Sequence, residues 1–91
     1  MTNDALARLR AATSRVVGSS QTAKAVVRGL ATEVFVAEDA DRRVVEPVIR
    51  AAAERGVPIT EVDSMAALGR ACGIAVGAAA AAVLAGDWRA S

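Results

Sequence analysis

The sequence predicts an α/β fold, a three-layer α/β/α sandwich, on three observations. Short runs of β-branched and aromatic residues alternate along the chain with segments of helical periodicity. Glycines, prolines and short polar side chains separate these segments, as expected at turns and helix ends. The chain has 91 residues, 54% of them apolar but mostly Ala and Val, which is enough for one thin core. This alternation predicts one sheet with helices on both faces.

A helix and a short strand are predicted first. The helix begins at Asn3 or Asp4, whose side chains can accept hydrogen bonds from the unpaired first amides, and it runs to about residue 13. Residues 16–17 (VV) follow a short polar break and predict a buried strand. The strand leads directly into a polar turn.

The second helix is predicted to begin at Ser19 or Ser20, either of which can act as its N-cap. Its interior is apolar, and Gly29 occupies the position after the helix where glycine is favoured. Residues 33–37 (EVFVA) are β-branched and aromatic, which predicts a strand.

An acidic loop at residues 38–41 leads into the third predicted helix. Pro47 is expected in the first turn of this helix, where a missing amide is tolerated, and Gly56 is expected to end it. Residues 57–62 (VPITEV) predict a strand, with Pro58 near its start as a first or edge position requires.

The last helix is predicted over residues 65–72, with Asp63 or Ser64 as its N-cap. Local patterns do not decide the secondary structure of the final segment. Residues 78–82 are alanines that favour helix, whereas residues 83–84 (VL) and the short length of chain that remains favour a buried strand. We expect one domain over residues 1–86 and a C-terminal tail at residues 87–91.

The composition argues against several classes of protein. The chain has one cysteine, Cys72, and no histidine, so an internal disulfide is excluded and the usual ligands of zinc and other transition metals are absent. We predict no metal, no cofactor and no enzymatic activity, because a nucleophile and its base would have to be assembled from Ser, Lys and carboxylates. With no leader pattern and no apolar run of roughly 20 residues, we predict a monomeric cytoplasmic protein without membrane contact.

Basic charge is concentrated near the N-terminus, although the net charge is only +1. Residues 1–30 carry five basic side chains and one acidic one, whereas residues 31–63 carry eight acids and four arginines. We expect the first group to surround the turn at residues 18–24 and to favour a polyanionic partner. The alternative is that these are ordinary solvated arginines.

Residues 18–24 (GSSQTAK) predict a ligand-binding helix entrance. A helix start leaves backbone amides unpaired and carries partial positive charge, so it can hold a phosphate or the acceptor edge of a base. The side chains suited to bind base edges or phosphates there are Ser19, Ser20, Gln21, Lys24 and Arg28.

Residues 69–79 (GRACGIAVGAA) predict a second contact segment. Apolar Ile74 and Val76 stand in a loop bracketed by glycines, a place where apolar side chains are usually avoided. Exposed there, they could cover the face of an unstacked base. The alternative is that both side chains fill the end of the sheet.

Four segments together resemble the kink-turn RNA-binding ribosomal protein family, the group of L7Ae and L30e. They are residues 18–24 (GSSQTAK), 36–41 (VAEDAD), 54–58 (ERGVP) and 68–79 (LGRACGIAVGAA), the last being the most specific. The resemblance runs from about residue 6 to residue 84 and is closest to small bacterial members described as ribosome-associated. It implies a four-stranded mixed sheet and a strand for the final segment.

The resemblance also implies roles for individual residues. In the family, the helix entrance contacts sheared G·A pairs of a sharply bent RNA, and the apolar loop covers a flipped-out nucleotide. Gly18 would allow close approach of the backbone, Gln21 would face guanine, and Lys24 would contact a base or a phosphate. The RNA would be rRNA or an mRNA leader, and the ribosome is a further candidate partner. The RNA-binding residues carried over are Gly18, Ser19, Ser20, Gln21, Lys24, Arg28, Glu38, Asp39, Ile74, Ala75 and Val76.

Two positions depart from the family pattern. Ser20 stands where Asn or Lys is common, and Ala75 stands where an acidic residue is usual. Losing one good base contact typically costs about 1–3 kcal/mol, so we expect weaker binding or a different preferred RNA. The alternative function is a protein-interaction or assembly module that keeps the fold with weak or no RNA binding.

Overall fold

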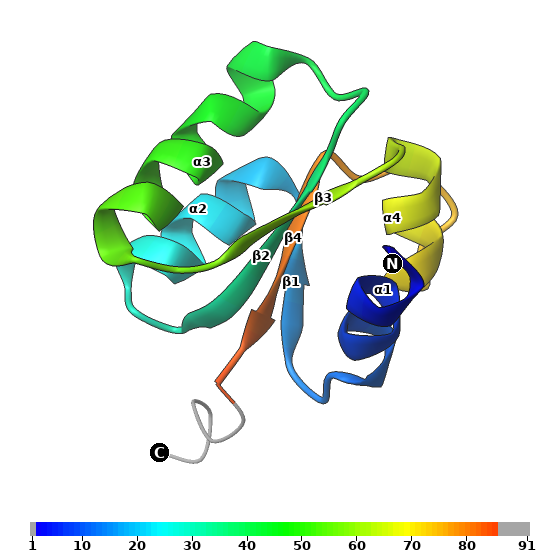
Figure 1. The fold of residues 1–91 in the computed structure, drawn as a ribbon, viewed down its shortest axis with the longest axis horizontal. Coiled ribbons are helices and arrows are strands. Elements are labelled where there is room, and N and C mark those ends of the chain that lie inside the picture. Colours follow the sequence, from blue (N-terminus) through cyan, green and yellow to red (C-terminus); the bar gives the residue numbers. More distant parts are fainter. Residues whose placement is uncertain (1, 86–91) are drawn as a thin grey trace.

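The computed structural model describes residues 2–85, and their side chains from residue 6 onward (Figure 1). Its elements are α1 (Thr2–Ala11), β1 (Arg15–Val17), α2 (Ser19–Val27), β2 (Ala31–Ala37), α3 (Arg42–Arg55), β3 (Ile59–Val62), α4 (Met65–Ala71) and β4 (Ala80–Leu84). The predicted order of elements is confirmed, including a strand in the final segment. The tail expected at residues 87–91 lies outside the described residues. None of the helices described is long and apolar enough to cross a bilayer.

The four strands form one mixed sheet in the order β1-β4-β2-β3. β4 is antiparallel to both β1 and β2, whereas β3 is parallel to β2. Figure 1 shows α2 and α3 on one face of the sheet and α1 and α4 on the other. The predicted three-layer α/β/α sandwich is therefore confirmed.

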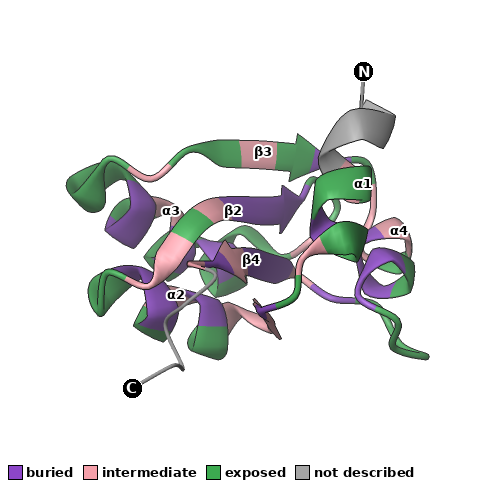
Figure 2. Cartoon of the chain, turned by 90° about the horizontal axis from the view of Figure 1, so that it is seen from below, coloured by how far each residue is buried: buried purple, intermediate pink, exposed green. Residues whose placement is uncertain are grey.

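The core is divided between the two faces by the alternation of side chains along β2 and β4. Val34 and Val36 belong to the cluster under α2 and α3, whereas Phe35 and Ala37 belong to the cluster under α1 and α4. Residues 80–82 of β4 are alanines with no exposed surface, so the helices of both layers lie close to the sheet. Figure 2 shows these buried residues, in purple, along β2 and β4 between the two helical layers.

The predicted serine caps of α2 are wrong. The N-cap is Gly18, with φ 102°, and no side chain accepts from the first amides of the helix. Gly18 donates its amide to the carbonyl oxygen of Ala80 at 2.8 Å, which keeps it in the sheet until the helix begins. Ser19 and Ser20 therefore fall inside the helix, and the turn needs the positive φ that glycine adopts without strain.

The boundaries of α1 also differ from those predicted. The helix begins at Thr2, so Asn3 and Asp4 lie within it, and it ends at Ala11. The Arg15 guanidinium donates to backbone carbonyls near that end. These contacts satisfy carbonyls that another helical turn would otherwise have to pair.

Pro47 lies in the second turn of α3 rather than in the first. The helix begins early because Asp41 is its N-cap and accepts from the amide of Arg43 at 2.9 Å. Pro47 is exposed, so water can satisfy the carbonyl that its missing amide leaves unpaired. β3 begins two residues later than predicted because the amide of Val57 closes the end of α3 on the carbonyl of Ala52.

Arg8 of α1 and Glu33 of β2 form a bidentate ion pair. The Arg8 Nε lies 3.0 Å from Glu33 Oε1 and its Nη2 lies 2.7 Å from Oε2, which also accepts from Thr60 Oγ1 at 2.9 Å. The hydrogen bond from Arg8 lowers the pKa of Glu33 below its ordinary value of 4.5, against the opposing effect of burial.

Replacing Glu33 by glutamine is expected to remove an acid-sensitive part of the stability. Because the folded-state pKa is depressed, the stabilisation is present above the unfolded pKa and is lost as the pH falls through the folded value. Urea unfolding should show the free energy of unfolding of the wild type decreasing from about pH 5 to about pH 3, and decreasing less in E33Q. The exposed control E54Q should behave as the wild type; identical profiles for wild type and E33Q would contradict the prediction.

Candidate nucleic-acid interface

Two backbone hydrogen bonds bring the predicted contact segments to one end of the sheet. The amide of Gly18 donates to Ala80 at 2.8 Å, and the amide of Ala37 donates to Ala79 at 2.9 Å. The start of α2 and the end of β2 therefore both border the point where the α4–β4 loop enters β4 (Figure 1). We call this region the α2–loop surface; it comprises residues 18–21 and 73–79, with residues 38–41 at its side.

The first turn of α2 presents unpaired backbone donors. Within the described part of the chain, the amides of Ser19, Ser20 and Gln21 have no acceptor, and the turn closes only where the amide of Thr22 donates to Gly18 at 2.9 Å. No acidic side chain occupies this first turn. The open amides and the positive end of the helix dipole together form a place for an acceptor or an anion.

Lys24 lies one turn further along α2 and borders two hollows. Among the side chains of residues 6–85, no carboxylate forms an ion pair with it. One hollow, of about 270 Å³, separates α2 from α3; its lining residues are Ser19, Ser20, Ala23, Lys24, Val44 and Pro47. The other, of about 130 Å³, lies on the far side of α2, with Gln21 and Arg28 among its lining residues. Lys24 can therefore reach a ligand that lies along either side of the helix.

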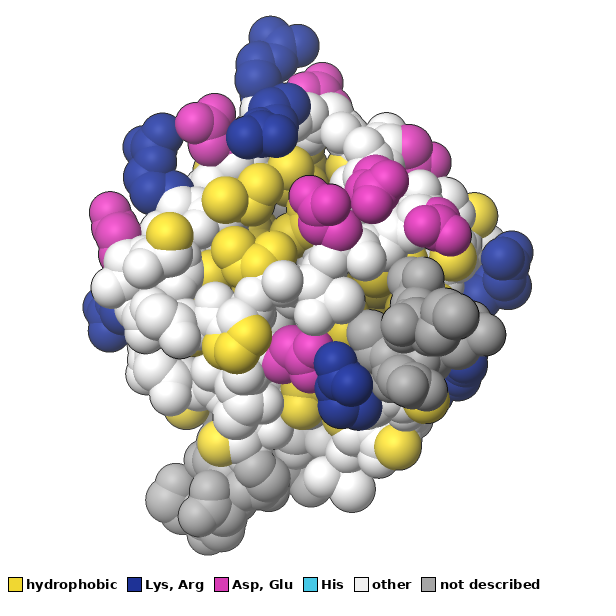
Figure 3. Space-filling model, in the orientation of Figure 1, with side chains coloured by type: hydrophobic (Ala, Val, Ile, Leu, Met, Phe, Trp, Pro, Cys, Tyr) yellow, Lys and Arg dark blue, Asp and Glu magenta, His cyan; other side chains and the backbone are white. Residues whose placement is uncertain are grey.

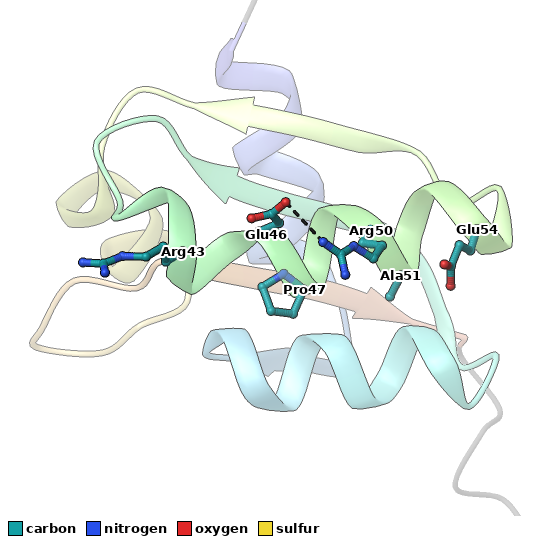
Figure 4. A pocket seen from close by; sticks show the side chains of 6 residues that line it. All are labelled: Arg43, Glu46, Pro47, Arg50, Ala51 and Glu54. Carbon is teal, nitrogen blue, oxygen red and sulfur yellow. Dashed lines mark hydrogen bonds and ion pairs between the residues drawn. The ribbon is translucent and has the colours of Figure 1, made fainter.

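A further hollow of about 380 Å³ runs along α3, and Arg43, Pro47 and Glu54 are among the residues that line it. Figure 4 shows Pro47 and Ala51 pointing toward α2 from α3. Glu46 accepts from Arg50 at 3.3 Å, so the charge of that pair is neutralised along the helix. This hollow thus offers less net positive charge than the hollow beside Lys24.

The α4–β4 loop packs tightly against its own helix at two glycines. A side chain on Gly69 would overlap the carbonyl oxygen of Val76, and one on Gly77 would lie 3.0 Å from the Cβ of Met65. With the backbone held inward, Ile74 is 37% exposed and Val76 is 71% exposed. The alternative in which both side chains fill the end of the sheet is therefore wrong, and two aliphatic side chains are available at the surface.

Glu38 and Asp39, two of the RNA-binding residues implied by the resemblance, lie in different environments. Asp39 Oδ1 accepts from the amide of Met65 at 2.8 Å, so this side chain helps the N-cap Ser64 to hold the start of α4. Glu38 is exposed; its amide donates to the carbonyl of Val62 at 2.8 Å, and its carboxylate has no partner among the side chains that the structure describes. Sequence reasoning missed the contact of Asp39 because its partner lies 26 residues away.

Arg28 is not brought together with the α4–β4 loop. It is the C-cap of α2, so it lies about 12 Å along the helix axis from Ser20 at the usual rise of an α-helix. The expectation that basic charge surrounds the turn is also wrong for Arg8, which pairs with Glu33, and for Arg15, which contacts the ends of α1 and α4.

Acidic side chains also stand beside the α2–loop surface. Figure 3 shows several of them close together on the face of the molecule that Figure 1 presents. The exposed acids near the ends of β2 and β3 are Glu38, Asp39, Asp41, Glu61 and Asp63. Within residues 2–85 they form no cluster suited to a metal ion. Their charge would repel phosphates and so favours approach of a polyanion from the α2 side.

The fold and this surface define a class of α/β/α protein with an open helix entrance next to an exposed aliphatic loop. Residues 2–87 match the Ribosomal protein L7Ae/L30e/S12e/Gadd45 family, and the chain belongs to that family. The predicted resemblance is thereby confirmed.

Individual relatives are similar over most of the chain. The RNA-binding protein YbxF of Geobacillus stearothermophilus is 58% identical over 69 residues, covering 76% of this chain and 84% of that protein. The large ribosomal subunit protein eL8 of Halobacterium salinarum is 45% identical over 69 residues, covering 75% of this chain and 58% of that protein. The solved structure of a Giardia lamblia 15.5kD RNA binding protein superposes with a TM-score of 0.80 at 31% identity, covering 91% of this chain and 70% of that one.

Proposed function

We propose that this protein binds RNA through the α2–loop surface and that its target is a kink-turn, a sharply bent RNA with sheared G·A pairs. Membership of the family and the RNA-binding names of similar proteins support RNA as the ligand. The observation that carries the proposal is the placement of the unpaired amides of α2 next to the exposed aliphatic loop. Polar donors for base edges and an apolar cover for an unstacked base are thus available at one end of the molecule.

Each part of the surface would meet a different part of the RNA. The amides at the start of α2 and the carboxamide of Gln21 would donate to base acceptors, with Gly18 permitting close approach of the backbone. Lys24 would neutralise phosphates where the bend brings the two RNA strands together. Ile74 and Val76 would cover the face of an extruded nucleotide.

The protein would act by shifting a conformational equilibrium of the RNA. A ligand that binds one conformer better raises the population of that conformer by its difference in affinity. The bent form offers converging phosphates and an exposed base, whereas a straight duplex offers neither. A ribosomal RNA or an mRNA leader that contains such a bend is the proposed target, bound by a single copy of this chain.

The short side chains of Ser20 and Ala75 would limit the affinity. Ser20 is exposed at the entrance, so its hydroxyl can still reach a base edge, but over a shorter distance than Asn or Lys. Ala75 lies exposed between Ile74 and Val76 and offers no acceptor to the RNA. Introducing Asn at residue 20 is a direct way to strengthen the same contact.

The proposal is tested with a kink-turn RNA that carries a donor and an acceptor dye at its two ends. Saturating protein should raise energy transfer, and the affinity should fall with increasing salt. A straight duplex of equal length is the control and should bind weakly without a change in transfer. Unchanged transfer at saturation would overturn kink-turn stabilisation; absence of any salt-dependent RNA binding would favour the protein-interaction function.

A further inference from the structure

Arg15 connects the C-terminal ends of two helices that are far apart in the sequence. It belongs to β1 and is half-buried. The backbone carbonyl oxygens that accept from its guanidinium are those of Leu9 (3.3 Å, Nη1), Arg10 (3.4 Å, Nη1), Ala12 (3.4 Å, Nη1) and Cys72 (3.2 Å, Nη2). The first three close the end of α1, and the fourth closes the end of α4.

The chemistry of these contacts suits arginine in particular. The last carbonyls of a helix lack partners within the helix and carry partial negative charge, so a cation there is favourable. A planar guanidinium presents several donors in a fixed fork, so one nitrogen can serve α1 while the other serves α4. A lysine ammonium at the same place would keep the charge but not this division of donors.

The contact with Cys72 lies at the base of the α4–β4 loop. Cys72 is the C-cap of α4, and Gly73 turns the chain out of the helix with φ 77°. Ile74 follows immediately, so the orientation of this apolar side chain depends on how the base of the loop is held. The opposite end of the loop is held separately, by the amide of Ala78, which donates to Met65 at 3.0 Å.

We propose that Arg15 is a positioning residue for RNA binding: it fixes the base of the α4–β4 loop so that Ile74 and Val76 are presented to the RNA, without contacting the RNA itself. This inference rests on the proposed function. The guanidinium is occupied by carbonyls of the α1 and α4 layer, on the other side of the sheet from α2. Its effect on binding is therefore transmitted through the loop and not through its charge.

Three variants separate the positioning effect of Arg15 on the loop from the effect of its charge on RNA binding. R15Q removes the charge and most of the donors, R15K keeps the charge but not the fork, and R10Q removes one charge from an exposed neighbour whose backbone carbonyl is retained. Each is titrated with the end-labelled kink-turn RNA at several salt concentrations, at a temperature where circular dichroism shows it folded. R15Q should bind roughly three- to tenfold more weakly than wild type with an unchanged salt slope. R15K should recover little of the loss, and R10Q should bind as the wild type.

Cys72 provides a measurement that does not involve RNA. Cys72 is 6% exposed, so access of a reagent to its thiol depends on opening of the base of the loop, and burial also raises the pKa of the thiol. Alkylation should be faster in R15K, which keeps the positive charge beside the thiol, than in wild type and R10Q. In R15Q the loss of that charge, which lowers the pKa of the Cys72 thiol, opposes the effect of opening the loop, so R15K is the decisive comparison. Both measurements are made on the full chain, and R15K serves if R15Q does not fold.

The outcomes distinguish the inference from the proposed function. If wild type binds the kink-turn and R15Q binds it equally well, or if R15K restores wild-type affinity, the positioning role of Arg15 is overturned. A reduced salt slope in R15Q would also overturn it, because that result assigns Arg15 to a phosphate. If wild type does not bind RNA, the proposed function fails; an unchanged rate of Cys72 alkylation in R15K would then overturn the role of Arg15 independently.

Discussion

Replacing Lys24 by alanine is expected to weaken kink-turn binding by roughly tenfold or more, the loss typical of one good contact to a base or phosphate. Lys24 is the only lysine of the chain, is exposed beside the open amides of α2 and has no acidic partner within the described residues. Its ammonium is therefore free to neutralise a phosphate. Releasing one counterion fewer should also lower the magnitude of the log–log salt slope by about 0.7–0.9.

The measurement is a titration of labelled RNA at four or five salt concentrations, with R55A as the matched control. Arg55 is an exposed basic residue in the last turn of α3, away from the α2–loop surface, and R55A removes the same charge. It should keep both the affinity and the salt slope of the wild type. Equal affinity of K24A and wild type would remove Lys24 from the site; equal losses in both variants would indicate only nonspecific attraction.

Replacing Gly69 by alanine is expected to reduce the free energy of unfolding by about 1–3 kcal/mol, the usual cost of overpacking. Alanine is normally the better helix former by about 1 kcal/mol, so intrinsic propensity predicts the opposite sign. At this position the added Cβ would overlap the carbonyl oxygen of Val76 and lie 3.1 Å from the Cα of Gly77. Both neighbours are backbone atoms, which cannot rotate away, so either α4 or its loop must move.

Urea unfolding of G69A and wild type measures this effect. A66G, on the exposed side of the same helix, reports the intrinsic cost of glycine in α4 and should lose about 1 kcal/mol. Because the loop is displaced, G69A should also bind the kink-turn RNA more weakly at a temperature where it is fully folded. A variant as stable as wild type would show that the loop relaxes without cost, and the close packing at Gly69 would then not determine its position.

The order of elements could be predicted because it depends on local chemistry. The signals that determine it affect the conformation of the nearest few residues only. They are the β-branched runs, the N-caps Asp41 and Ser64, and the glycines that follow α2, α3 and α4. The final strand could not be predicted from its own residues, because alanine favours helix. Burial between β1 and β2 decides the conformation of residues 80–84, and on sequence grounds only the resemblance to the family decided between helix and strand.

The parts of the candidate site that could not be predicted depend on contacts distant in the sequence. The open start of α2 results from the bond between Gly18 and Ala80, and Asp39 contacts a residue 26 positions away. Arg15 contacts Cys72, 57 positions away in the sequence. The sequence suggested that the charge of Arg15 faces a polyanion, whereas in the structure its guanidinium binds backbone carbonyls. The segments that converge were therefore predictable, whereas the division between supporting and exposed side chains was not.

Three successive alanines at the centre of the sheet set the thickness of the molecule. Residues 80–82 point alternately to the two faces and have no exposed surface, so the spacing of both helical layers from β4 depends on a single methyl group at each position. A longer aliphatic group there would move a whole layer outward, and with it either the first turn of α2 or the base of α4. The distance between the first turn of α2 and the α4–β4 loop, the two segments proposed to contact the RNA, thus depends on three alanine side chains that no ligand can reach.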